Sequence, residues 1–254
     1  MTTTSPKPYT PQLVISVRDV NEALMAQRAG ADVIDIKEPT RGSLGAADRQ
    51  VVKEILEQIA DTTVVSVACG ELAQWRPADS LANDGPIQFA KVGLAGCRHH
   101  QAWESLWYRW RKALPGHTRA VMCCYADWQP AGAPSPNQAV AVAAKLGAEG
   151  LLFDTWDKTK GHLFEFMTDS QLGSLVEMAA ADGLWVALAG KLDATLIRRC
   201  LEPAPRYLAF RGAVCRRDRT RQLDESRLRT LVGQIRSISQ EHKQPHEQPA
   251  HEHL

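Results

Sequence analysis

Charged side chains lie at the ends of short apolar segments of this sequence, where they could face a common cavity. Asp35 and Lys37 are two residues apart in the segment VIDIK, so in an extended strand their side chains point to the same face. Lys91 interrupts the apolar segment FAKVGL, and Asp154 lies near the end of GLLFDT, with Lys158 four residues later. Together these residues would bring three amines and two carboxylates to one site.

Such a site could carry out amine catalysis. Burying unpaired charges costs free energy, so the groups must form ion pairs or shift their pKa values. Neighbouring cations lower the pKa of a lysine, and a neutral lysine amine is the group that forms a Schiff base with a carbonyl substrate. The aspartates could hold the remaining cations or move protons. A ring of ion pairs that only fills a protein core fits the same spacing.

A second group of residues indicates anion binding. Glycine allows the backbone to approach a phosphate closely, and free backbone N–H groups bind it. The candidates at the ends of the last two apolar segments are Gly190, Lys191, Arg211, Gly212 and Ala213. The run 211–221 adds Arg216, Arg217, Arg219 and Arg221, for which a solvated basic loop is an equally good interpretation.

The elements that must position these residues alternate between strands and helices. Eight short apolar segments are expected to be strands, at 13–17, 33–37, 63–70, 89–94, 120–127, 150–155, 185–190 and 207–212. Helical periodicity fills most of the gaps, at 20–30, 48–60, 103–114, 137–147, 170–183, 193–201 and 224–239. Gly30 is expected to end the first helix, and Asp48 to cap the second. Prolines and a glycine interrupt the crossover 71–88, so its helical pattern is the weakest of the crossovers.

This alternation predicts an α/β protein with a parallel sheet. Eight strand–helix units in about 250 residues are typical of a single (β/α)8 TIM barrel, whose reactive groups lie at the carboxyl ends of the strands and whose phosphate site commonly follows the last two strands. An open doubly wound sheet is the alternative. No G-x-G-x-x-G follows the first strand, which disfavours dinucleotide binding. We expect a flexible N-terminal arm over 1–12, the barrel over 13–239 and a disordered His-rich tail over 240–254.

Composition excludes several classes of protein. The 254 residues are 44% hydrophobic and 23% charged with a formal net charge of +1, which argues against a wholly disordered chain and a dedicated nucleic-acid binder. No segment is apolar for the roughly 18 residues that a membrane span needs. The polar N-terminus does not have the pattern of a secretory signal. Six cysteines match no zinc-binding spacing, so we expect a reduced, cytoplasmic protein without a metal.

The histidines and the potential nucleophiles of the sequence do not indicate a second catalytic or metal site. His99 and His100 have no partner ligands nearby in the sequence, so they do not indicate a metal site. Ser66 and Cys69 could act as nucleophiles only with a base, and no histidine lies close in sequence to the end of an expected strand. The lysines and aspartates therefore remain the candidates.

Longer motifs add a resemblance to a known family. An ordered set of segments stands out within about residues 13–235: AGADVIDIKEPTRGSLGAA (29–47), FAKVGL (89–94), YAD (125–127), LLFDTWDKTKGHLFEF (151–166), ALAG (187–190) and FRGAVCRRDR (210–219). In these segments the sequence resembles the (5-formylfuran-3-yl)methyl phosphate synthase family. One departure is Gly70-Glu71, where the family usually has a Gly-Asp pair.

The resemblance implies a homo-oligomeric (β/α)8 lyase in methanofuran-type cofactor synthesis. It would condense two molecules of the triose phosphate glyceraldehyde 3-phosphate, with loss of phosphate and water. By this resemblance Lys37 forms the Schiff base, Lys91 accepts a proton, and Asp35, Asp154 and Lys158 support them, with no cofactor or metal. Two alternatives remain: a Schiff-base aldolase for another phosphorylated aldehyde or ketone, and a non-catalytic barrel that binds a phosphate ligand.

Overall fold

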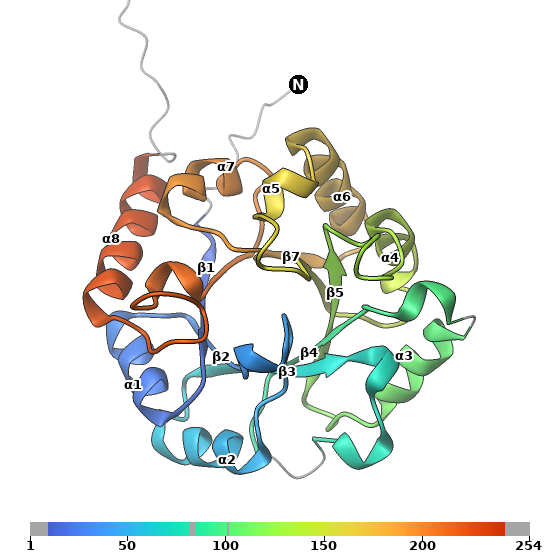
Figure 1. Ribbon diagram of the computed structural model, residues 1–254, viewed down its shortest axis with the longest axis horizontal. Helices are drawn as coiled ribbons and strands as arrows, with labels where there is room; N and C mark the ends of the chain where they lie inside the picture. The colour runs from blue at the N-terminus through green and yellow to red at the C-terminus, as the bar shows by residue number, and fades with distance from the viewer. Residues whose placement is uncertain (1–9, 82–84, 101, 242–254) are drawn as a thin grey trace, which may run out of the picture.

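Eight parallel strands close into a barrel in the computed structural model, which describes residues 10–81, 85–100 and 102–241 (Figure 1). The strands are β1 (Gln12–Val17), β2 (Val33–Ile36), β3 (Val64–Glu71), β4 (Phe89–Gly93), β5 (Arg119–Tyr125), β6 (Gly150–Asp154), β7 (Trp185–Leu188) and β8 (Tyr207–Phe210). Each strand pairs with the next in the sequence, and β1 pairs with β8. The predicted (β/α)8 barrel is confirmed, and the open doubly wound sheet is wrong because the sheet has no edge.

Helices surround the barrel on the outside (Figure 1). They are α1 (Val20–Ala29), α2 (Arg49–Gln58), α3 (Trp103–Lys112), α4 (Pro136–Ala143), α5 (Leu163–Phe166), α6 (Asp169–Ala181), α7 (Ile197–Leu201) and α8 (Glu225–Glu241). The crossover from β3 to β4 contains two short 3-10 turns, Leu72–Gln74 and Pro77–Asp79, and no α-helix in its described part. This agrees with its interrupted periodicity.

Capping residues begin and end the first two helices in different ways. The Asp19 side chain accepts a hydrogen bond from the Glu22 N–H at 2.9 Å, and Gly30 ends α1 with φ 90°, as predicted for a left-handed C-cap. Asp48 does occupy the N-cap position of α2, but the predicted cap bond is wrong. Its carboxylate instead accepts a hydrogen bond from the Arg41 guanidinium at 2.8 Å, so it holds the preceding loop.

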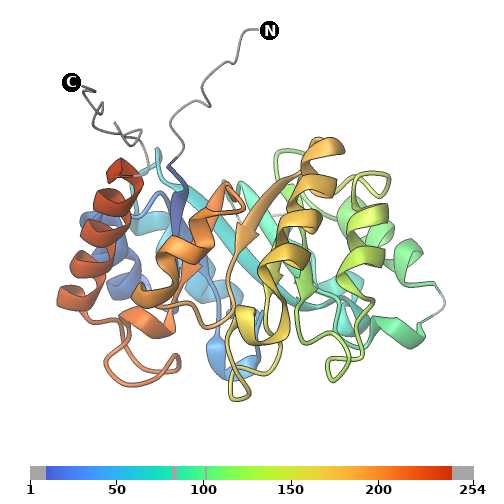
Figure 2. The ribbon, with the colours of Figure 1, turned by 90° about the horizontal axis from the view of Figure 1, so that it is seen from above.

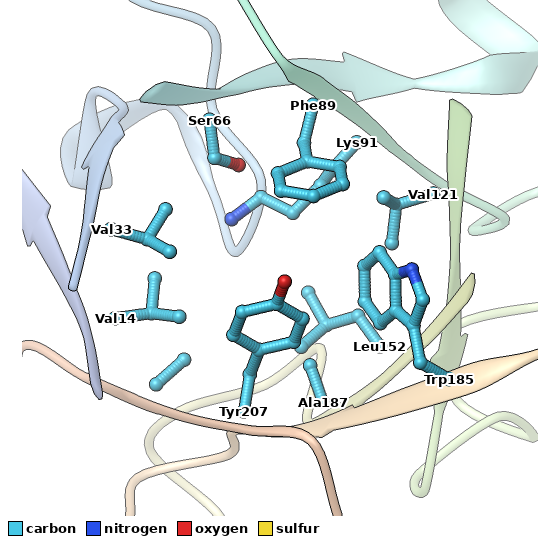
Figure 3. A pocket seen from close by; sticks show the side chains of 11 residues that line it. Val14, Val33, Ser66, Phe89, Lys91, Val121, Leu152, Trp185, Ala187 and Tyr207 are labelled. Carbon is cyan, nitrogen blue, oxygen red and sulfur yellow. The ribbon is translucent and has the colours of Figure 1, made fainter. Parts of the chain in front are cut away.

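Aromatic side chains fill the amino-terminal end of the barrel interior. Phe89, Trp185 and Tyr207 are the first residues of their strands, and their rings meet edge to face with centroids 4.9 to 6.1 Å apart (Figure 3). Gly150 makes room for them, because a Cβ there would lie 2.3 Å from the Trp185 ring. A small apolar cavity of about 30 Å³ separates this cluster from Lys91. A substrate must therefore enter from the opposite, carboxyl end.

The loops that follow β2, β6 and β8 project from that same carboxyl end (Figure 2). Along the chain, β1 begins at Gln12 and α8 ends at Glu241, so the predicted arm and tail lie almost wholly outside the described residues. No described helix is both long and apolar enough to cross a lipid bilayer.

Candidate active site

A cavity of about 890 Å³ opens at the carboxyl ends of the strands. Its walls come from β1, β2, β4 and β6 and from the loops after β2, β6, β7 and β8. All of the residues predicted for chemistry or phosphate binding line it: Asp35, Lys37, Lys91, Asp154, Lys158, Gly190, Lys191, Arg211, Gly212 and Ala213. Residues that are more than 170 positions apart in the sequence thus share one site, and their roles remain predictions.

The first buried ion pair joins β2 to β4, which β3 separates in the sheet, across the barrel interior. Lys91 Nζ lies 2.5 Å from Asp35 Oδ1, and both side chains are buried. The other carboxylate oxygen of Asp35 accepts a hydrogen bond from Ser16 Oγ at 2.8 Å. Ser16 is in register with Asp35 on the adjacent strand β1. Ser16 was not among the predicted site residues. Its hydroxyl, which interrupts the apolar segment LVISV, is the sequence feature that could have indicated an inward-facing polar group.

The second ion pair joins the partly exposed Lys158 to the buried Asp154 at the end of β6. Asp154 also accepts hydrogen bonds from the Thr155 N–H at 2.8 Å and from Ser43 Oγ at 3.1 Å. Burial acts to raise the pKa of the Asp154 carboxyl, but the ammonium groups of Lys158 and Lys37 outweigh burial and hold this pKa below its usual value. Asp154 therefore stays ionised and compensates a lysine charge.

Lys37 differs from the other two lysines because no described carboxylate lies within ion-pair distance of its amine. Its Nζ reaches only the Ser43 carbonyl oxygen, at 3.4 Å. The pKa of Lys37 is lowered to about 7, and burial is the largest cause. The ammonium groups of Lys158 and Lys91 lower this pKa further, whereas the carboxylates of Asp35 and Asp154 raise it. The carboxylates thus pair with two lysines and leave the third as an amine that is about half neutral near pH 7.

The loops after β7 and β8 form the opposite side of the cavity. Gly190 and Lys191 both have positive φ, 97° and 54°, a conformation that is uncommon for a lysine. A 3-10 turn over Gly212–Val214 follows β8. Within the described part of the chain, no group accepts a hydrogen bond from the backbone N–H groups of Gly190, Lys191, Gly212 or Ala213. These N–H groups are available for an anion such as phosphate.

The Arg211 guanidinium is engaged in the protein itself. It forms a buried ion pair with Glu22 at 2.9 Å and donates hydrogen bonds to the carbonyl oxygens of Ser16, Arg219 and Arg221 at 2.5 to 3.0 Å. A phosphate-binding role for Arg211 would therefore fall to its backbone. Glu22 lies on helix α1, and nothing in its sequence surroundings marked it as a buried charge.

Arg219, for which anion binding and a solvated loop were equal alternatives, and His162, which was not predicted, also line the cavity. Arg219 is half-buried and reaches from the β8 loop to the β2 loop, so the interpretation of a solvated side chain is wrong for it. His162 lies eight residues beyond the end of β6, too far along the sequence to be predicted as a residue of the strand end. A long loop can return a side chain to a site that its sequence position does not suggest. No cluster of three or more potential metal ligands occurs among the described residues.

Comparison with known proteins identifies a family. A family model described as 4-HFC-P synthase matches residues 13–232. The (5-formylfuran-3-yl)methyl phosphate synthase of Methanopyrus kandleri is 33% identical over 231 residues, 86% of this chain and 95% of that protein. The enzyme of the same name from Methanothermobacter thermautotrophicus is 32% identical over 209 residues, 80% of this chain and 89% of that protein.

A solved structure supports the fold alone. Phosphoribosyl anthranilate isomerase from Thermus thermophilus superposes with a TM-score of 0.64 over 89% of this chain and 99% of its own, at 16% sequence identity. At that identity the likeness concerns the barrel architecture and not the reaction.

Proposed function

The chain belongs to the 4-HFC-P synthase family, and on this basis we propose that it condenses two molecules of glyceraldehyde 3-phosphate to (5-formylfuran-3-yl)methyl phosphate through a Schiff base on Lys37. Members named (5-formylfuran-3-yl)methyl phosphate synthase are enzymes, and this chain is one as well. The product would serve a methanofuran-type cofactor. The protein would act as a homo-oligomer in the cytoplasm.

One observation carries the proposal: among the four lysines that line the cavity, Lys37 is the one whose side chain is buried without an ion pair, and its pKa lies at about 7. A Schiff base needs an unprotonated amine to attack the aldehyde carbon. Lys91 and Lys158 carry Asp35 and Asp154 as partners, and Lys191 is exposed. The site thus contains one buried amine outside an ion pair beside two lysines that are paired with carboxylates.

The chemistry proceeds in steps that balance without an oxidant or reductant. The Lys37 amine adds to the aldehyde of the first triose phosphate, and water leaves to form an iminium. The iminium withdraws electrons, so a base can take the proton from the adjacent carbon, and the resulting enamine expels the phosphate from the third carbon. That third carbon, now an enol methylene, attacks the central carbonyl carbon of the second triose phosphate after its isomerisation to the ketone, and water leaves from the new carbinol. Hydrolysis of the iminium releases Lys37, and ring closure with loss of a further water gives the furan, so that in total one phosphate and two waters leave.

Lys91 is the proposed base for the proton on the carbon next to the iminium, and it would act together with Asp35. At 2.5 Å, the Asp35 carboxylate is in direct contact with the Lys91 amine, so a proton taken from the substrate would be shared by this pair. Ser16 donates to the other oxygen of this carboxylate and fixes its orientation. On the opposite side, the free N–H groups after β7 and β8 would hold a substrate phosphate.

The experiment that tests this proposal combines product formation with trapping. Purified protein is mixed with glyceraldehyde 3-phosphate, and furan absorbance and released phosphate are followed. A second sample is reduced with borohydride and mapped by mass spectrometry. We expect equal amounts of furan and phosphate and an adduct on Lys37. An adduct without furan would indicate an aldolase for another substrate, and the absence of both would refute the proposal.

The rate of imine trapping on Lys37 is expected to rise with pH and to reach half its maximum near pH 7. The folded-state pKa of about 7 means that about a tenth of the Lys37 amine is neutral at pH 6 and about nine tenths at pH 8. Initial rates of borohydride-trapped adduct, measured across this range, check the prediction. Circular dichroism at each pH controls for unfolding. A midpoint near pH 10, the value for an exposed lysine, would contradict it.

A further inference from the structure

We propose that Arg219 is a positioning residue for the Lys37 amine and acts on it through the β2 loop, which we define as residues 37–48. This role of Arg219 rests on the proposed function in one respect: Lys37 is the amine that forms the Schiff base. Arg219 itself lies on the β8 loop, residues 211–224, and lines the cavity mouth.

The Arg219 guanidinium joins the two loops across the mouth of the cavity. Its Nη1 donates to the Pro39 carbonyl oxygen at 3.0 Å, and its Nη2 donates to the Gly42 carbonyl oxygen at 2.9 Å. Both acceptors belong to the β2 loop and are about 180 positions away in the sequence. A planar guanidinium can serve two carbonyls at once, whereas an ammonium at the same place could not reproduce the geometry.

The β2 loop responds to this contact as a unit because it is folded tightly. The Glu38 N–H donates to the Gly45 carbonyl oxygen at 2.8 Å, and a Cβ on Gly45 would lie 2.2 Å from the Glu38 carbonyl oxygen. At the inner side of the loop, the buried Ser43 contacts the reactive groups. Its carbonyl oxygen accepts from Lys37 Nζ, and its hydroxyl is bonded to Asp154 and to the Thr155 carbonyl oxygen.

The outer end of this connection is anchored in the scaffold. The Arg219 carbonyl oxygen accepts a hydrogen bond from Arg211 Nε at 2.5 Å, and Arg211 is fixed by its buried ion pair with Glu22 on helix α1. A continuous series of contacts therefore runs from α1 through both loops to Lys37. Loss of the Arg219 side chain would release the β2 loop from that anchor.

Release of the loop should raise the pKa of Lys37. Burial is the largest influence on that amine, so water that enters beside a loosened Ser43 would stabilise the charged form. The charged groups that face Lys37 are Asp35 on its own strand, Asp154 and Lys158 at the end of β6, and Lys91 on β4. These groups remain when Arg219 is replaced, and removal of its positive charge acts in the same direction as hydration.

The test measures the Lys37 pKa without substrate, so it is separate from the test of the proposed function. Wild type, Arg219→Gln and Arg216→Gln are labelled with trace acetic anhydride from about pH 5 to about pH 11, and the Lys37 peptide is quantified by mass spectrometry. Arg216 is an exposed arginine of the same loop and serves as the matched control. We expect midpoints near pH 7 for wild type and Arg216→Gln, and a midpoint about one unit higher for Arg219→Gln. Labelling at pH 7 would then fall about fivefold.

If Lys37 of Arg219→Gln is labelled with the same midpoint pH as Lys37 of the wild type, the positioning role of Arg219 is wrong. Arg219→Lys keeps the charge but not both hydrogen bonds, and its midpoint should lie between the other two; this variant also gives the answer if Arg219→Gln does not fold. Thermal melting of each variant identifies such a failure. If wild type makes no furan while the midpoint shifts as expected, the proposed reaction fails and the positioning role stands.

Discussion

Replacing Lys37 by methionine is expected to abolish both furan formation and the borohydride-trapped adduct, with a loss of activity of at least about a thousandfold. The reason is that the amines of Lys91 and Lys158 are bound to Asp35 and Asp154, and Lys191, the remaining lysine of the cavity, is exposed, so none of them can replace the buried Lys37 amine. The measurement is the rate of phosphate release from glyceraldehyde 3-phosphate, with Lys145→Met, which removes an exposed lysine, as the control. Retention of full activity would remove Lys37 from the mechanism.

The same variant is expected to be more stable than the wild type near neutral pH. The pKa of Lys37 is about 7 in the folded state and about 10.5 in the unfolded chain. Below pH 7 both states carry the charge, and the folded state bears the full cost of burying it. Between pH 7 and pH 10.5 only the unfolded state binds the proton, so wild-type stability rises with pH. Lys37→Met should therefore gain on the order of 3 kcal/mol at pH 6, and the gain should shrink toward pH 10.

Urea unfolding curves at several pH values check this prediction. A stabilised but inactive Lys37→Met protein would show that the loss of activity does not come from misfolding. It would also show that the site keeps an unfavourable buried amine for its reactivity. A variant that is less stable than wild type at pH 6 would contradict the assignment of Lys37 as the uncompensated cation.

Replacing Glu22 by alanine is expected to destabilise the fold by about 3 to 5 kcal/mol. Glu22 and Arg211 form an ion pair in which both side chains are almost fully buried, 2% and 3% exposed. The Glu22 carboxylate also accepts hydrogen bonds from the backbone N–H groups of Arg18 at 2.9 Å and Leu223 at 3.2 Å. Its removal leaves the Arg211 guanidinium buried without a counter-charge.

Urea denaturation at neutral pH measures the effect, and Glu57→Ala is the matched control. Glu57 pairs with Lys53 at 3.8 Å on the exposed face of α2, so its loss should cost less than about 1 kcal/mol. Burial acts to raise the pKa of Glu22, but Arg211 and Arg18 outweigh it and lower this pKa. The stabilisation is thus present above pH 4.5 and is lost as the pH falls through the folded-state pKa. Equal effects of Glu22→Ala and Glu57→Ala would refute a structural role for the buried pair.

The sequence alone determined the barrel and the lysines and aspartates that form the ion pairs of its cavity. Strand alternation is a local property, so the spacing of Asp35 and Lys37 was enough to predict that both point inward. The apolar neighbours on both sides of Lys91 identified it as an inward-facing charge, and Asp154 was identified by its place at the end of a strand. Eight repeats of strand and helix then predicted closure, and the ordered motifs of the 4-HFC-P synthase family supported it.

The tertiary structure decided which charges meet. No local pattern shows that Asp35 pairs with Lys91 on β4 and not with Lys37 on its own strand, because that pairing depends on distances across the closed barrel. Ser43 and Arg219 reach the site from loops, whose course has no periodicity to be read from the sequence. Glu22 and Arg211 are 189 positions apart and meet only because β8 closes on β1. Burial sets the pKa of Lys37, and burial exists only once these distant segments have packed together.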